Sequence, residues 1–124
     1  MGADWQRTPN ALHDGMSELP DPVLVVLCTA PTPEVGAKLA RELVAQRLAA
    51  CVNIVPAVRS IYEWNGQVED ETESQLVIKT RRQRWDALCA WLEQHHPYDT
   101  PEILALSTTA GSEGYLNWVC AQTR

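Results

Sequence analysis

Three side chains in this sequence form a candidate set of metal ligands. His95 and His96 are adjacent and precede Pro97 in the stretch HHPYDTPEI (residues 95–103), and Cys28 lies in the apolar run VLVVLCTA. A thiolate and two imidazoles form a soft ligand set that suits Cu(I) and, less well, Zn(II). The alternative is structural: a buried thiol on a strand, and two histidines that end a helix, where the helix dipole favours them.

The order of the expected elements predicts the fold class. Apolar runs rich in β-branched residues indicate strands, and apolar residues spaced three and four apart indicate helices. In chain order, we expect a strand at 23–30, a helix at 32–50, strands at 51–63 and 67–80, a helix at 81–96, a strand at 101–108 and a helix at 112–122. The class is therefore α+β, a ferredoxin-like β-α-β-β-α-β arrangement with an added C-terminal helix.

Cap and turn residues support these boundaries. Thr32 is placed to cap the first helix and Thr80 the second. Pro56 predicts a bulge or a sheet edge, because proline cannot donate to the ladder. Asn65-Gly66 is a strong hairpin signal and predicts a long hairpin from the second and third strands. The acids of the return strand could bind a hard cation, but they alternate along the strand and do not all face one point, so we expect them to form a solvated edge. They are Glu69, Asp70, Glu71 and Glu73.

The topology predicts that the candidate ligands converge. Right-handed crossovers place the first and third strands in the centre of the sheet and the last strand antiparallel beside the first. The end of the first strand, at Cys28, then lies next to the start of the last strand, near Glu102. The second helix delivers His95 and His96 to the same corner. Adjacent helical residues do not share a face, so both histidines bind one ion only if the helix frays at Pro97.

Six short motifs resemble the CutA family, the divalent-cation tolerance proteins. They are LVVLCTAP (24–31), LAACVNIVP (48–56), SIYEWNG (60–66), IKT (78–80), HPYDTPEI (96–103) and YLNW (115–118). The resemblance implies a single ferredoxin-like domain at 23–124, assembled into a homotrimer similar to the PII signalling proteins. It also implies a cytoplasmic protein that binds copper, or related soft or divalent cations, through Cys28, His95 and His96, with no organic cofactor.

The resemblance implies a second candidate site in clefts between subunits. Its residues are Trp64, Lys79, Tyr98, Glu102, Tyr115 and Trp118. The corresponding alternative function is a PII-like signalling trimer that binds a small ligand or an unidentified protein partner in these clefts. The structural interpretation is that the aromatic residues pack the interface, where aromatic side chains are enriched, and that Lys79 pairs with Glu102 or another acid.

Length, composition and charge exclude several classes of function. The 124 residues fit one domain, and the net charge of −6 argues against nucleic acid or an anionic membrane as a partner. There is no apolar run long enough for a transmembrane helix. We expect residues 1–22 to form a flexible leader rather than a signal peptide, and the other cysteines to be free thiols. Nucleophile-elbow, P-loop and dinucleotide motifs are absent from the sequence, so we expect no enzyme activity.

Overall fold

The structure, a computed structural model, describes residues 22–124, so the expected leader lies outside the described residues except for Pro22. The predicted order of strands and helices is confirmed. In chain order the elements are β1 (Val23–Ala30), α1 (Pro33–Ala45), β2 (Cys51–Trp64), β3 (Gln67–Arg81), the 3₁₀ turn η3 (Arg82–Arg84), α2 (Trp85–His95), β4 (Ile103–Ser107) and α3 (Glu113–Gln122). Within residues 22–124, no helix is both long and apolar enough to span a membrane.

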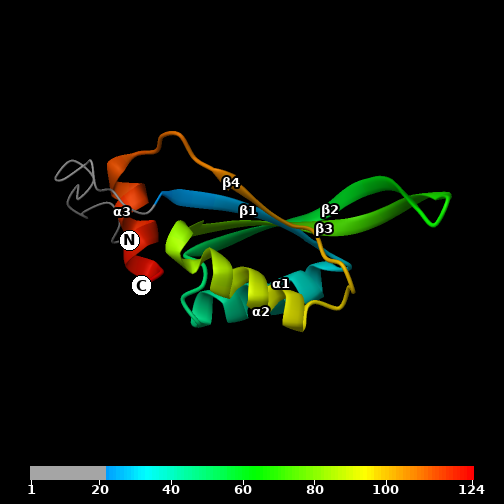
Figure 1. Ribbon diagram of the computed structural model, residues 1–124, viewed down its shortest axis with the longest axis horizontal. Helices are drawn as coiled ribbons and strands as arrows, with labels where there is room; N and C mark the ends of the chain where they lie inside the picture. The colour runs from blue at the N-terminus through cyan, green and yellow to red at the C-terminus, as the bar shows by residue number, and fades with distance from the viewer. Residues whose placement is uncertain (1–21) are drawn as a thin grey trace.

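The four strands form one antiparallel sheet in the order β2-β3-β1-β4. The predicted central positions of β1 and β3 are therefore correct, as is the place of β4 beside β1. Cys28 of β1 lies opposite Leu76 of β3 on one side and Ile103 of β4 on the other. Helices α1 and α2 lie on the same face of this sheet, and α3 lies at the end far from the hairpin tip (Figure 1).

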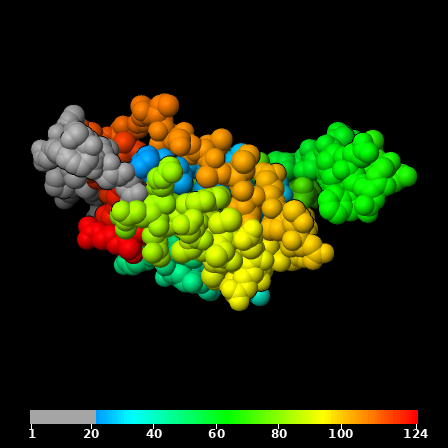
Figure 2. Space-filling view, viewed as in Figure 1, coloured from blue at the N-terminus to red at the C-terminus, as the bar shows by residue number. Residues whose placement is uncertain are grey.

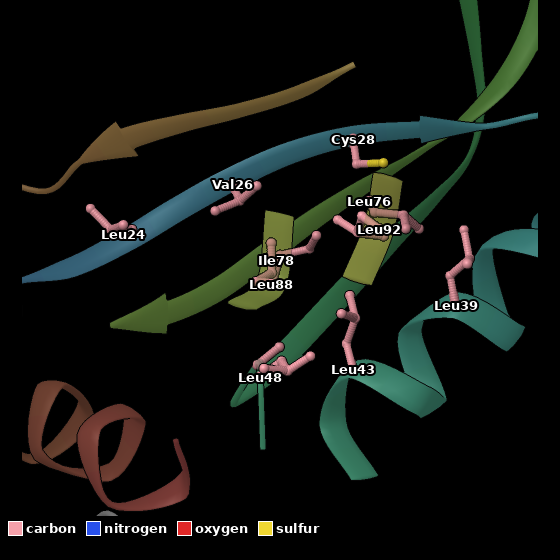
Figure 3. Packing of buried hydrophobic residues seen from close by; sticks show 11 residues of the cluster. Leu24, Val26, Cys28, Leu39, Leu43, Leu48, Leu76, Ile78, Leu88 and Leu92 are labelled. Atoms are coloured by element: carbon pink, nitrogen blue, oxygen red, sulfur yellow. The ribbon is translucent and has the colours of Figure 1, made fainter. Parts of the chain in front are cut away.

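The core lies between the sheet and helices α1 and α2. Alternate residues of β1 point into it, because successive side chains of a strand face opposite sides. Cys28 is fully buried there, and Figure 3 shows it beside Leu76 of β3 and Leu92 of α2. The remaining members of the cluster include Leu24, Val26, Leu39, Leu43, Leu48, Ile78 and Leu88.

The opposite face of the sheet is covered by α3 at one end, where Val119 packs with Val23 and Ala50, and it exposes apolar residues elsewhere. Ile103 and Ala105 pack against the core, so the intervening positions of β4 face the other way. These are Leu104 and Leu106, which are 54% and 46% exposed, and Val55 of β2 is 39% exposed. In the single chain, the face toward α1 and α2 is therefore buried more completely than the opposite face.

The β2–β3 hairpin extends beyond the body of the molecule (Figures 1 and 2). Its turn has φ of 52° at Asn65 and 78° at Gly66, the left-handed conformation that an Asn-Gly turn supplies. The register shifts between Val55 and Val58, on either side of Pro56. Both sequence signals are therefore confirmed: the proline lies at a bulge in an edge strand, and Asn-Gly forms the turn.

Two helix boundaries differ from the prediction. Helix α1 ends at Ala45 because the chain reverses into the left-handed region at Arg47, with φ of 60°. Helix α2 begins at Trp85, after the 3₁₀ turn, and Thr80 does not cap it. The Thr80 side chain is buried in β3 and donates a 2.7 Å hydrogen bond to the carbonyl of Leu48. Thr32 does cap α1, accepting from the Val35 amide at 3.1 Å.

Candidate functional site

The two histidine rings leave the end of α2 in different directions. His95 is the last residue of α2, and its ring stacks on Trp91 with centroids 4.2 Å apart. Its Nδ1 donates to the Trp91 carbonyl at 2.9 Å. His96 has an extended backbone, with ψ of 142°, because the following Pro97 disfavours the helical conformation. The exposed His95 ring therefore lies beside α1 and α2, while the buried His96 ring reaches β1.

Both nitrogens of His96 are occupied by hydrogen bonds. Nε2 donates to the carbonyl oxygen of Thr29 at 2.8 Å, since a carbonyl can only accept. Nδ1 accepts from the backbone amide of Tyr98 at 3.1 Å. The proton is thus on Nε2 and the Nδ1 lone pair is used. A metal ligand needs a free nitrogen lone pair, and this ring has none to offer.

Cys28 is a core residue. It is fully buried, and its thiol donates a weak 3.7 Å hydrogen bond to the Thr29 carbonyl. Burial, followed by the negative charges of Glu102 and Glu73, raises the pKa of Cys28 to about 12. Metal binding requires the thiolate, which this environment disfavours.

The single chain does not assemble the expected copper site. Cys28, His95 and His96 come from neighbouring elements, as predicted, but they serve three different local contacts. Throughout residues 22–124, no three His, Cys, Asp or Glu side chains are grouped so as to hold a metal ion. The proposed ligand set therefore does not fit copper in this arrangement.

The expected inter-subunit cleft residues divide into two groups. Trp64, Tyr98 and Glu102 line one pocket at the base of the hairpin. Tyr115 and Trp118 lie on α3, with ring centroids 5.7 Å apart, at the other end of the sheet (Figure 1). Lys79 of β3 donates to Oδ1 of Asn53 on β2, rather than to the expected Glu102. One chain therefore supplies two separate parts of the expected cleft.

The pocket at the hairpin base is acidic and aromatic, and we call it the acid-lined pocket. It has a volume of about 420 Å³. It lies where the hairpin leaves the body, next to the segment that joins α2 to β4. Its lining consists of Thr29, Tyr62, Trp64, Glu71, Glu73, Tyr98, Asp99, Thr100 and Glu102. Four of these nine residues are acids and none is basic, so the pocket favours a positively charged ligand.

Two tyrosines hold carboxylates of this pocket. The hydroxyl of Tyr98 donates to Oε2 of Glu73 at 2.7 Å, and that of Tyr62 donates to Oε1 of Glu71 at 2.8 Å. Burial and the bond to Glu73 raise the pKa of Tyr98, and the bond to Glu71 is the main cause that raises the pKa of Tyr62 to about 12. Both hydroxyls therefore stay protonated and donate at neutral pH.

Sequence reasoning considered Glu71 and Glu73 as hard-cation ligands but did not place them in a pocket. The hairpin acids were expected to be a solvated edge, yet Glu73 is only 8% exposed. The available signal was their spacing: residues 69, 71 and 73 alternate, so they share one face of β3, while Asp70 faces the other way and binds Arg59. What the spacing did not reveal is that Tyr98 covers this face.

The sequence and fold of the chain resemble those of known proteins. The family model for the CutA1 divalent ion tolerance protein matches residues 24–122. The chain belongs to this CutA1 family. Among its curated relatives, the divalent-cation tolerance protein CutA of Pectobacterium atrosepticum is 45% identical over 101 residues, which are 82% of this chain and 92% of that protein.

Two plant relatives extend the comparison. The chloroplastic protein CutA of Arabidopsis thaliana is 47% identical over 103 residues, 83% of this chain, but the match spans only 57% of the plant protein's length. The crystal structure of CutA1 from Oryza sativa superposes with a TM-score of 0.81 at 44% identity, covering 83% of this chain and 94% of that one. The CutA1 fold thus accounts for nearly the whole described part of this chain.

Proposed function

We propose that this CutA1 family member contributes to divalent-cation tolerance by binding hydrated divalent cations in the acid-lined pocket, as a cytoplasmic homotrimer. The observation that carries the proposal is the pocket's composition. Four carboxylates surround a cavity of about 420 Å³ whose described lining contains no lysine, arginine or histidine. Glu73 is buried in this lining, and its hydrogen bond is to a neutral phenol. A cation would offset the cost of burying that negative charge.

The size of the pocket fits an ion that keeps its water. Six water molecules at about 30 Å³ each occupy roughly 180 Å³, less than half of the cavity. Small divalent cations such as Mg²⁺ lose water reluctantly and are often bound by one or two carboxylates together with several waters. This mode of binding needs no group of three converging ligands, in keeping with the dispersed acids of the pocket.

The donor chemistry favours hard cations. Carboxylate, hydroxyl and water oxygens suit Mg²⁺, Ca²⁺ and Mn²⁺, and Cu²⁺ also accepts oxygen donors. Cu(I) is a softer ion that prefers thiolate. The proposal therefore places divalent cations at Glu73 and its neighbours, and it does not use Cys28, whose thiol is buried and protonated.

Assembly into a trimer is supported by the open sheet face. Leu104, Leu106 and Val55 expose apolar surface on the side of the sheet opposite α1 and α2. Leu104 and Leu106 lie beside the half-buried Leu27 and Val25 of β1, and a contiguous apolar patch of this kind marks an interaction site. Strand β4 is also an edge of the sheet, with backbone groups free to pair with another chain. A head-to-tail contact that closes forms a ring, and the number three rests on the resemblance to the family.

Manganese binding tests the proposal. Wild type and Glu73→Gln would be titrated with Mn²⁺, and free Mn²⁺ would be followed by electron paramagnetic resonance. We expect saturable binding that is weakened at least about tenfold in Glu73→Gln, because a charged ligand group is lost. Glu93→Gln is the matched control, since Glu93 is an exposed acid on α2 that does not line the pocket. Equal affinity in all three proteins would refute the site. If Glu73→Gln alone weakens binding, competition with Mg²⁺ and Cu²⁺ ranks the cations.

A further inference from the structure

Strand β1 extends past the end of its pairing with β4, and the carbonyl of Thr29 lies in the part that β4 leaves unpaired. Pairing between β1 and β4 ends at Cys28 and Ile103. The next carbonyl of β1, that of Thr29, is buried and accepts the Nε2 proton of His96 at 2.8 Å. A buried carbonyl without a partner is costly, so the imidazole replaces the strand that is missing there.

The same ring continues the connection into the pocket. The amide of Tyr98 donates to Nδ1 of His96 at 3.1 Å, and the two rings lie 4.8 Å apart. The hydroxyl of Tyr98 then donates to Glu73 at 2.7 Å. Three successive hydrogen bonds thus link Thr29 on β1 to Glu73 on β3 through the segment between α2 and β4.

The two hydrogen-bond partners of His96 fix its tautomer. The ring must present a donor to a carbonyl and an acceptor to an amide at the same time. Only the Nε2-protonated imidazole does both. His95, one residue earlier, contacts Trp91 and has no part in the connection.

We propose that His96 is a positioning residue, not a metal ligand: it connects the end of β1 to Tyr98 and so holds Glu73 in place in the acid-lined pocket. This inference rests on the proposed function for its consequence, cation binding, but its geometry is independent of it. The two adjacent histidines therefore have different roles, whereas in the expected copper site both would be ligands.

The test compares His96→Gln with His95→Gln as the matched control. Amide hydrogen exchange is measured at Tyr98, whose N–H loses its acceptor, and at Val26 in the core of β1. We expect exchange at Tyr98 to accelerate about fivefold or more in His96→Gln, the factor expected for one lost hydrogen bond. Exchange at Val26 should change much less, because the effect is local. His95→Gln should change neither.

Cation affinity gives the second readout. Mn²⁺ affinity should fall several-fold in His96→Gln and stay unchanged in His95→Gln. If His96→Gln does not fold, His96→Ala removes the side-chain acceptor of the Tyr98 amide with a smaller side chain. Unaltered Tyr98 exchange in the folded variant would overturn the inference. So would an equal loss of Cu(I) affinity, measured by chelator competition, in Cys28→Ser, His95→Gln and His96→Gln. If wild type binds no Mn²⁺, the proposed function fails, while Tyr98 exchange still decides the role of His96.

Discussion

The hydroxyl of Tyr98 lies 2.7 Å from Oε2 of Glu73, and this bond joins the segment before β4 to the hairpin strand β3. Glu73 is 8% exposed, so its carboxylate depends on this neutral donor for part of its solvation. The contact closes one wall of the acid-lined pocket. It also explains why a charged residue in the hairpin is buried without disrupting the fold.

Removing that donor should destabilise the protein. We expect Tyr98→Phe to lower the free energy of unfolding by about 1–3 kcal/mol, because the buried Glu73 oxygen loses its hydrogen bond. Urea denaturation of wild type and variant measures the difference. Tyr62→Phe is the control, since Tyr62 makes the same kind of bond to Glu71 but is 41% exposed. Water can replace its hydroxyl, so its cost should be clearly smaller. Equal costs would contradict the role assigned to burial.

The Cys28 thiol should give stability a distinct pH dependence. Burial raises its pKa in the folded state to about 12 from an ordinary value of 9.0. A raised folded pKa means that this contribution is complete below pH 9 and is lost as the pH rises toward 12. We therefore expect wild type to lose stability relative to Cys28→Ala over this interval. Urea unfolding of both proteins at pH 8 and at higher pH measures the difference, in which other titrating groups cancel.

A chemical control accompanies this prediction. The other three cysteines are partly exposed, whereas Cys28 is buried. In native protein at pH 8, alkylation followed by peptide mass spectrometry should leave Cys28 unmodified until denaturant is added. Rapid modification of Cys28 in the folded protein would show that its thiol is accessible and able to act as a metal ligand.

The open sheet face should control assembly. Wild type is expected to have a mass near three times 13.8 kDa by light scattering. Leu106→Arg should shift the protein toward the monomer, because a charge in an apolar contact cannot be desolvated cheaply. The monomer itself should tolerate the change, since Leu106 is 46% exposed.

Val44→Arg is the matched control for assembly. Val44 is 44% exposed but lies on α1, on the other side of the sheet. The Val44→Arg substitution should leave the mass of the assembly unchanged. If both variants, or neither, dissociate, the open face of the sheet is not the contact between subunits.

The sequence by itself determined the elements and their order. Alternation and β-branching marked the strands, Thr32 set the start of α1, and Asn65-Gly66 fixed the hairpin turn, because each of these signals is local. The six motifs that resemble the CutA family were also recognisable in the sequence alone. Sequence order and crossover handedness were enough to place β1 and β3 in the centre of the sheet.

Tertiary structure alone decided which side chains meet. Periodicity assigns Glu73 to a face of β3, but only packing shows that Tyr98, in the segment between α2 and β4, covers that face. Likewise, His95 and His96 are equivalent as residue types, and the turn before Pro97 separates them, sending one ring to Trp91 and the other to Thr29. The physical reason is that a residue's face is set by its own backbone, whereas its partners are set by contacts between distant segments, such as the 67 positions that separate His96 from Thr29.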